Sequence, residues 1–306
     1  MCDPPIVWVY NKSMKRSASA ISIKKLNKSF GSKHALKDVS FAIPEGQISG
    51  FLGPNGAGKT TTIRCLMDFI RGDSGEIKVL GMDAREDSVA LKAKIGYVPS
   101  DHQLNEKWTG EQHITYISQA RGVSGTAPEI VERMHLDVGS KVKNLSSGNK
   151  QKLSIILALI GNPSLLVLDE PTQGLDPLFQ NEIYEILRDF QQTGGTVLIS
   201  SHNLSEVQRL CSRVVIIRDG QIIAEEPLDS LRALNTHEIT VRFAKKVSPK
   251  VFERDGVVVT AHAPTEISMK VRGGLDAVVK QLAAYSVVDL QVTHASLEEV
   301  FMEMYQ

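Results

Sequence analysis

One stretch of the chain carries residue types that bind phosphate. Residues 53–61 read Gly-Pro-Asn-Gly-Ala-Gly-Lys-Thr-Thr, follow the apolar run 48–52 and precede a segment with helical character. Three glycines let the backbone curl so that successive N–H groups point at one anion, and the following helix adds the positive end of its dipole. Lys59 supplies a cation for the β- and γ-phosphates, and the Thr60 hydroxyl is placed to ligate Mg²⁺.

The alternative for this stretch is a chance glycine turn. All fixed positions of the pattern GxxxxGK[ST] are present between a strand and a helix, so we predict a nucleoside triphosphate site. The residues expected to bind the nucleotide are Gly53, Pro54, Asn55, Gly56, Ala57, Gly58, Lys59, Thr60 and Thr61.

A second group of candidate residues follows another apolar run. Residues 165–168 are Leu-Leu-Val-Leu, the pattern of a strand covered on both faces, and Asp169 and Glu170 come directly after it. An acidic residue at a strand end can hold Mg²⁺, usually through water, and a second carboxylate can orient an attacking water. A solvated strand end or a helix cap is the alternative. Because the phosphate-binding pattern is present, we predict that Asp169 supports Mg²⁺ and that Glu170 is the general base.

The composition limits the classes of function. The 306 residues include 35 Lys and Arg and 35 Asp and Glu, so the formal net charge is zero. A dedicated nucleic-acid binder carries a basic excess, so no nucleic-acid partner is expected. No stretch approaches the ~20 apolar residues of a membrane span, and the three cysteines lack metal-site or disulfide spacing, which fits a reducing cytosol. Any relation to a membrane is expected to run through a partner.

Strands that alternate with helices predict an α/β domain with a largely parallel sheet and a smaller antiparallel subdomain. The expected strands are 21–23, 39–43, 48–52, 76–80, 95–98, 165–168, 196–200, 214–217 and 221–224. The expected helices are 63–70, 89–94, 150–160, 182–191 and 204–211, with a helix-rich stretch over 105–143 that breaks at 122–125.

The two ends of the chain differ from this alternation. Residues 1–20 have a mixed composition and are expected to be a disordered leader, in which Met14 is an alternative start to Met1. Expected strands at 239–243, 257–260, 267–271 and 287–292, with helices at 275–285 and 297–304, predict a small accessory α+β domain over 236–306. A ferredoxin-like arrangement is one form it could take. A disordered tail is the alternative, which the clear alternation opposes.

Several motifs in fixed order make the chain resemble the ATP-binding subunit of an ABC transporter, over residues from about 21 to 230. Residues 53–61 are similar to the Walker A loop, and residues 165–170 to Walker B with its catalytic glutamate. Residues 145–149 read Leu-Ser-Ser-Gly-Asn and resemble the family signature, normally LSGGQ, with Ser147 and Asn149 in place of a glycine and the glutamine.

Three further residues support the resemblance. Asp176 ends a Gly-Leu-Asp sequence that resembles the D-loop, and His202 resembles the switch histidine that positions the γ-phosphate. Phe30 lies where the family places an aromatic ring that stacks on adenine. The implied fold is a P-loop NTPase of the ABC ATPase type, with a mixed sheet, an antiparallel β subdomain and a helical subdomain at about 100–160.

The resemblance also implies a way of working. Two such domains face head to tail, so that Ser146 and Gly148, at the start of a helix, cap the γ-phosphate bound to the other copy's loop. ATP then closes the dimer and hydrolysis opens it. The catalytic residues implied by this reading are Lys59, Glu170 and His202.

Two further departures from the family pattern lie near the expected site. Ser100 stands where the family usually has a glutamine that reaches the metal and the attacking water, and whose loop transmits closure to the membrane subunit. Ser100 is therefore a candidate Mg²⁺ ligand, and Asp101 and Gln103 are alternatives if the loop shifts. Gln173 precedes the D-loop where serine is common.

The C-terminal sequence points to a subfamily. Residues 296–301, Ser-Leu-Glu-Glu-Val-Phe, are similar to the tail of bacterial drug-, antibiotic- and polysaccharide-exporting ABC-2-type ATPases. This resemblance implies an ATPase, converting ATP and water to ADP and phosphate, that powers export through a separate multispan permease at the inner face of the cell membrane. The second ATPase subunit is expected to be an identical chain. The alternative is a soluble ABC-type ATPase, or an ATP-binding regulator, that remodels a complex without transport.

Overall fold

The computed structural model describes residues 19–101, 103–123, 128–229, 236–272 and 274–294. The chain divides into two compact units, Met1–Glu226 and Pro227–Gln306. The first unit contains all the motifs that predict nucleotide chemistry.

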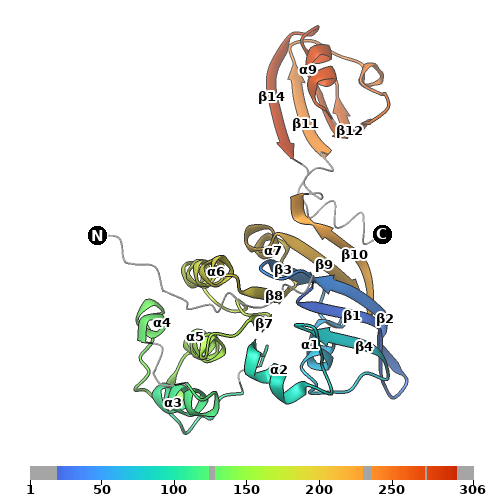
Figure 1. Cartoon of the computed structure of the whole chain (residues 1–306). Coiled ribbons are helices and arrows are strands. Elements are labelled where there is room, and N and C mark those ends of the chain that lie inside the picture. Colours follow the sequence, from blue (N-terminus) through green and yellow to red (C-terminus); the bar gives the residue numbers. More distant parts are fainter. Residues whose placement is uncertain (1–18, 102, 124–127, 230–235, 273, 295–306) are drawn as a thin grey trace. The chain divides into compact units, whose positions relative to one another are not determined.

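A sheet of six strands in the order β10-β9-β3-β8-β7-β6 lies at the centre of the first unit (Figure 1). The pairs β3–β8, β3–β9, β7–β8 and β6–β7 are parallel. Strands β3, β7 and β8 are buried along their whole length, which explains why their sequences are largely apolar. The six strands are β3 (Ile48–Leu52), β6 (Ile95–Val98), β7 (Leu165–Asp169), β8 (Thr196–Ser201), β9 (Arg213–Arg218) and β10 (Gln221–Pro227).

A second sheet has four strands in the order β2-β1-β4-β5, and its pairs are antiparallel. Its strands are β1 (Ile21–Phe30), β2 (Lys33–Ile43), β4 (Ser74–Val79) and β5 (Met82–Asp83). Ala20 was expected in the leader, yet it is buried and its N–H donates to the Ile43 carbonyl at 2.7 Å. The Ala20 carbonyl accepts from Leu80 at 2.7 Å, so the ordered chain begins before the first predicted strand.

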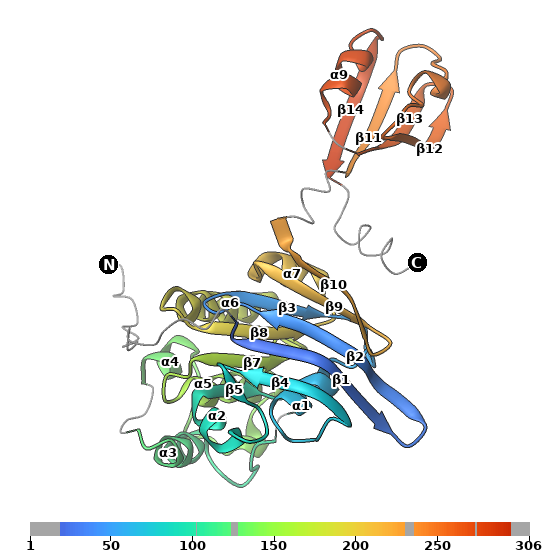
Figure 2. The same ribbon diagram turned by 45° about the vertical axis from the view of Figure 1, so that its right-hand side comes forward.

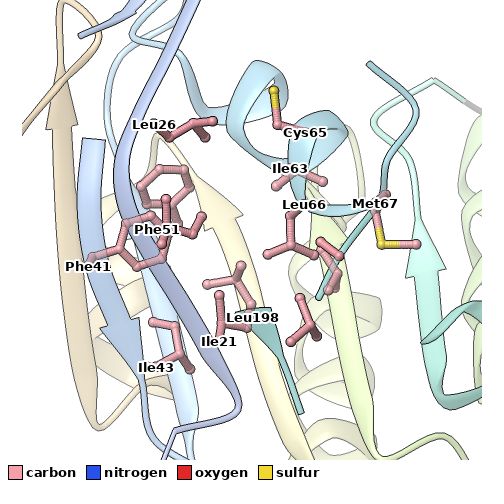
Figure 3. Packing of buried hydrophobic residues seen from close by; sticks show 14 of the residues in the cluster. Ile21, Leu26, Phe41, Ile43, Phe51, Ile63, Cys65, Leu66, Met67 and Leu198 are labelled. Carbon is pink, nitrogen blue, oxygen red and sulfur yellow. The ribbon is translucent and has the colours of Figure 1, made fainter. Parts of the chain in front are cut away.

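Buried side chains of both sheets and of helix α1 (Lys59–Leu66) form one hydrophobic cluster (Figure 3). Ile63 and Leu66 of α1 are both buried in this cluster. Phe41 of β2 and Phe51 of β3 lie 5.2 Å apart between ring centroids. Because α1 begins directly at the phosphate-binding stretch, this packing also fixes the position of that stretch.

The remaining helices of the unit are α2 (Ser88–Lys94), α3 (Gly110–Ala120), α4 (Pro128–Arg133), the 3-10 turn η1 (Val142–Asn144), α5 (Ser147–Leu159), α6 (Pro177–Gln192) and α7 (Leu204–Leu210). Helices α3, α4 and α5 lie together on one side of the unit, and strands β1 and β2 lie on the other (Figures 1 and 2). The Arg121 guanidinium joins this group to the central sheet, donating to the carbonyls of Ile160 and Ile95 at 2.9 Å each. Burial lowers the pKa of Arg121. In the described part of the chain, no helix is long and apolar enough to cross a bilayer.

Two helix boundaries correct the sequence-based expectations. Helix α1 spans Lys59–Leu66 where 63–70 was predicted, because the phosphate-binding stretch runs straight into the first turn, with Gly58 as the N-cap residue. Helix α6 spans Pro177–Gln192 where 182–191 was predicted. The Asp176 side chain accepts from two N–H groups of that first turn at 3.1 Å, and proline is favoured at the first helical position.

The second unit is a sheet in the order β12-β13-β11-β14, with three antiparallel pairs. This strand order, with α9 between β13 and β14, is the ferredoxin-like arrangement, with the 3-10 turn η2 in place of the first helix. Its elements are β11 (Thr236–Phe243), η2 (Pro249–Val251), β12 (Val257–Ala263), β13 (Glu266–Arg272), α9 (Asp276–Leu282) and β14 (Val287–His294). The predicted terminal helix at 297–304 lies outside the described residues.

Candidate nucleotide site

Parallel strands place the candidate residues at one edge of the central sheet. Strands β6, β7, β8 and β3 are neighbours and run in the same direction, so their carboxyl ends share that edge. Ser100 follows β6, Glu170 follows β7, His202 follows β8, and the stretch 53–61 follows β3. Ligands of open α/β sheets bind outside the carboxyl ends of strands, so the topology collects these residues into one site.

Two glycines of the stretch 53–61 are required by close contacts. A Cβ on Gly53 would lie 2.3 Å from the Ile217 carbonyl oxygen. Gly58 has a φ of +113°, and a Cβ there would lie 2.8 Å from Leu36 Cδ2 and 3.1 Å from the Ala35 carbonyl oxygen. The first N–H groups of α1 have no partners within the helix, and together with the helix dipole they favour an anion at this end.

The Lys59 ammonium lies at the base of this stretch. It donates to the carbonyls of Gly53 at 2.6 Å and Pro54 at 3.2 Å, and its Nζ lies 3.1 Å from Glu170 Oε1. The Lys59 side chain is only 6% exposed, so these partners offset the loss of water around its charge. A single cation therefore links the phosphate-binding stretch to the predicted base.

Thr60 and Asp169 lie in contact, although 109 positions separate them in the chain. The Thr60 hydroxyl donates to Asp169 Oδ2 at 2.8 Å, and the Ser200 hydroxyl donates to Asp169 Oδ1. Asp169 is fully buried. Hydroxyl and carboxylate oxygens are the ligands that Mg²⁺ prefers, so these two side chains fit the metal that the sequence predicts.

Glu170 and His202 form a close pair. His202 Nδ1 lies 2.7 Å from Glu170 Oε2, and the His202 side chain is 44% exposed while that of Glu170 is 12% exposed. The backbone of Glu170 has a φ of +54°, a left-handed conformation that costs a residue with a Cβ about 1–2 kcal/mol. Ser200 holds it there, because the Glu170 N–H donates to the Ser200 carbonyl at 3.2 Å and hydroxyl at 3.1 Å. Backbone strain of this kind clusters at functional sites.

An open cleft of about 760 Å³ is lined by Lys59, Thr60 and Glu170 from these groups. Phe30 lines it with a half-exposed ring, and Ser100 and Asp101 also line it. Gln103 lines a different pocket, so Ser100 and Asp101 are the candidates that face the phosphate-binding stretch. The cleft is lined by Phe30, Lys33, His34, Ala35, Lys37, Pro54, Asn55, Gly56, Gly58, Lys59, Thr60, Thr61, Ser100, Asp101, Glu170, Gln173, Asp219 and Gly220.

Some lining residues carry no motif and were missed by sequence reasoning. Lys33 and Lys37 of β2 add positive charge to the cleft. Asp219 and Gly220 connect the predicted strands 214–217 and 221–224, and both have a left-handed backbone, which fits the turn type that Asp-Gly favours. The Gly220 N–H donates to the Ala57 carbonyl at 2.9 Å, which brings this turn against the phosphate-binding stretch.

The signature residues lie apart from this cleft in the single chain. The Ser146 hydroxyl accepts from the Asn149 N–H at 3.2 Å and caps helix α5. Ser146, Gly148 and Asp176 are absent from the residues that line the cleft in the described part of the chain. The other predicted residues line the cleft, belong to the stretch 53–61 or, like Asp169 and His202, contact a residue that lines it. Ser146 and Gly148 lie at the start of α5, and Asp176 lies at the start of α6.

Comparison with known proteins decides the family. The ABC transporter family matches residues 36–173. Nod factor export ATP-binding protein I of Bradyrhizobium diazoefficiens is 34% identical over 88% of this chain and 94% of its own length. Daunorubicin resistance ATP-binding protein DrrA3 of Streptomyces coeruleorubidus is 31% identical over 94% of this chain and 96% of its own. The chain belongs to the ABC transporter family. Linearmycin resistance ATP-binding protein LnrL of Bacillus subtilis is 35% identical over 67% of this chain and 68% of its own.

Solved structures agree with the fold of this ABC ATPase. The structure of an ATP-binding subunit of an ABC transporter has a TM-score of 0.66 and 29% identity, covering 70% of this chain and 92% of that one. A dimeric ATP-binding cassette in a post-hydrolysis state has a TM-score of 0.62 at 24% identity, covering 68% and 98% of the two chains, and shares the fold. The predicted P-loop fold of the ABC type is confirmed.

The family also confirms the predicted activity. This ABC ATPase is an ATP-binding subunit whose hydrolysis of ATP is coupled to transport. The relatives are ATP-binding proteins of exporters and drug-resistance systems, which bears out the predicted class, an ATPase that drives export through a separate permease. ABC ATPase subunits work with a membrane permease and dimerise.

The geometry predicts the effect of a methyl group at Gly58. Gly58→Ala should weaken ATP binding about tenfold or more, equivalent to ~1.4 kcal/mol, because the new Cβ both clashes and forces a left-handed alanine. Titration of the purified chain with a fluorescent ATP analogue measures this change. Gly46→Ala is the control, since Gly46 also has a positive φ but has open space around it. Equal affinities for Gly58→Ala and the unmodified chain would contradict the steric argument.

Proposed function

We propose that two copies of this chain together power the export of a substrate through a separate membrane permease. The proposal rests on the observation that some of the nucleotide motifs line the cleft and the signature motif does not. The phosphate-binding stretch and Glu170, whose carboxylate contacts His202, line the cleft, while Ser146 and Gly148 lie at the start of α5 and do not line it. A second chain, placed head to tail, would supply those signature residues to this cleft.

The nucleotide and the metal fit the residues of the cleft. The N–H groups of the stretch 53–61 and the Lys59 ammonium would hold the ATP phosphates, and the Phe30 ring would stack on adenine. Thr60 and Asp169 would hold Mg²⁺, which when bound neutralises charge between the β- and γ-phosphates. Ser100 is the candidate further ligand because it lines the same cleft. If ATP hydrolysis by Ser100→Ala requires the same Mg²⁺ concentration as hydrolysis by the unmodified chain, Ser100 is not a metal ligand.

We propose Glu170 as the residue that acts on water. Its carboxylate is largely buried, lies at the end of β7 and contacts both Lys59 and His202. A carboxylate in such a position can accept a proton from an attacking water, and His202 can orient both the carboxylate and the γ-phosphate. Buried neighbours on strands β7 and β8 keep the pair aligned.

Glu170→Gln should retain ATP binding and lower the steady-state rate of hydrolysis about 10²-fold or more, because the amide cannot accept the proton. ATP should then hold the chain as a dimer, since opening requires hydrolysis. Phosphate release measures turnover, and light scattering with and without ATP measures the dimer. Glu225→Gln is the control, because that carboxylate pairs with Arg213 at 2.9 Å outside the cleft. Normal turnover in Glu170→Gln would remove Glu170 as the base.

The orientation of the trapped dimer can be tested in the same variant. Asn55 and Ser147 are exposed, one in the phosphate-binding stretch and one in the signature. When a Glu170→Gln chain carrying Asn55→Cys is mixed with one carrying Ser147→Cys, oxidation with ATP should give a covalent dimer. Replacing Ser147→Cys by Val89→Cys, which is exposed on α2, should give none. Equal cross-linking of the two mixtures would contradict the head-to-tail arrangement.

A groove beside the cleft supports contact with the permease. Pro99, Gln103 and Leu104 line it together with residues of α3 and α5, in a volume of about 260 Å³. The same loop carries Ser100 into the nucleotide cleft, so a partner seated in the groove would sense the loop that faces the phosphates. We assign the groove to a segment of the permease, which would hold this ATPase at the inner face of the membrane.

Co-purification from membranes tests this partner. Leu104→Arg, which places a charge in the groove, should lower the amount of multispan protein that purifies with the tagged chain about tenfold, while ATP binding by the isolated chain persists. Val89→Arg is the control, because Val89 is exposed on α2 and does not line the groove. If the unmodified chain purifies with soluble proteins only, the result would favour the alternative function, a soluble ABC-type ATPase that remodels a complex without transport.

A further inference from the structure

A buried carboxyl group lies just outside the nucleotide cleft. Glu206, on helix α7, is only 4% exposed and is absent from the cleft lining of the described residues. Acidic side chains are rarely buried to this extent unless they are paired, because the loss of water destabilises the charge. Glu206 therefore needs specific partners, and their identity shows what it does.

Both oxygens of Glu206 accept hydrogen bonds from hydroxyl groups. Thr172 Oγ1 donates to Oε1 at 2.6 Å, and Ser201 Oγ donates to Oε2 at 2.5 Å. Thr172 is two residues after Glu170, and Ser201 is the residue before His202. One carboxylate thus ties together the two backbone segments that carry the predicted base and its histidine partner.

The backbone around Ser201 makes this link stiff. The Asn203 N–H donates to the Ser201 hydroxyl at 2.9 Å, and the Asn203 side chain caps α7 by accepting from the Ser205 and Glu206 N–H groups. The segment from Ser201 to Glu206 is therefore a closed turn. A shift of α7 would move Ser201, and His202 with it.

The segment after Glu170 is also held from its other side. Gln151 Nε2 donates to the Pro171 carbonyl at 2.6 Å, and the Gln151 side chain is buried on helix α5. Pro171 and Thr172, which follow Glu170 directly, are thus fixed between α5 and α7. Because Glu170 adopts a left-handed conformation, these contacts help to hold a backbone that would otherwise relax.

The electrostatic surroundings connect the same groups. Burial raises the pKa of Glu206, the hydrogen bonds from Ser201 and Thr172 oppose that rise, and the Glu170 carboxylate adds to it. The neighbouring His202 lowers the pKa of Glu206. Glu206 is therefore coupled both by hydrogen bonds and by charge to the pair at the end of strands β7 and β8.

We propose that Glu206 is a positioning residue of the hydrolytic site, which keeps Glu170 and His202 at hydrogen-bond distance by binding Thr172 and Ser201. The inference rests on the proposed roles of Glu170 and His202 in hydrolysis. The two residues of the pair follow different strands, so their 2.7 Å contact depends on whatever fixes those strand ends relative to each other. A misplacement of ~1 Å at a reacting group can cost about 100-fold in rate.

The test separates positioning from folding by comparing turnover with ATP affinity. Glu206→Ala should lower kcat by about 10- to 100-fold and leave the dissociation constant for ATP within about twofold. Glu206 binds the hydroxyls of Thr172 and Ser201, whereas the phosphate-binding stretch meets Ser201 through its backbone carbonyl, which accepts from the Gly53 N–H at 3.2 Å. Glu206→Gln should retain most of the rate, since its amide can accept from one hydroxyl and donate to the other. Thr172→Val and Ser201→Ala, which each remove one of the bonds, should fall between these limits.

Thr196→Val is the matched control, because the Thr196 hydroxyl is buried at the opposite end of β8 and accepts from the Gly46 N–H at 2.9 Å. It should leave kcat unchanged.

If Glu206→Ala does not fold, the kcat values of Thr172→Val and Ser201→Ala decide alone. The proposal would be overturned if folded Glu206→Ala, Thr172→Val and Ser201→Ala all had a normal kcat. It would also be overturned if Glu206→Gln lost as much kcat as Glu206→Ala. Glu170→Gln, measured in the same assay, distinguishes failure of this proposal from failure of the proposed function. Normal turnover in Glu170→Gln would refute Glu170 as the base, whereas the Glu206 variants test the positioning role.

Discussion

The ion pair between Lys59 and Glu170 is the contact on which the site depends. It joins the stretch that follows β3 to the residue that follows β7, across the intervening strand β8. His202, at the end of β8, approaches the other oxygen of the same carboxylate. The three neighbouring strand ends thus converge on one side chain. The parallel sheet makes this possible, because it aligns the carboxyl ends of strands that are far apart in the sequence.

The conformation of Glu170 has a structural cost that its neighbours offset. Its left-handed backbone is held by two hydrogen bonds from its N–H to Ser200, while the Ser200 hydroxyl also binds Asp169. Glu206 and Gln151 fix the following residues from two helices. Helix α5, which carries Gln151, begins at the signature residues. The segment that follows the proposed base is therefore hydrogen-bonded to the helix that would serve the partner's cleft in the proposed dimer.

The candidate site residues chosen from the sequence lie at one edge of the central sheet, whereas the predicted boundaries of several elements were wrong. The glycines and Lys59 were identified because phosphate binding requires particular residues at fixed spacing. The start of α1 was placed four residues late, since a glycine-rich stretch gives no helical periodicity by which to detect a first turn. The start of α6 was missed in the same way, although the side chain of Asp176 and the proline after it were the available signals.

The sequence by itself determined the fold family, the phosphate-binding stretch, the acidic strand end and the signature, because each needs particular residue types in local order. Only the tertiary structure decided which of these residues meet. It placed Ser100 and Asp101 in the cleft and Gln103 in another pocket. It brought Lys33, Lys37 and the turn at Asp219 beside the phosphate-binding stretch, and joined Glu206 to Thr172 and Ser201. Those contacts arise from strand order and helix packing, which connect residues that no local pattern relates.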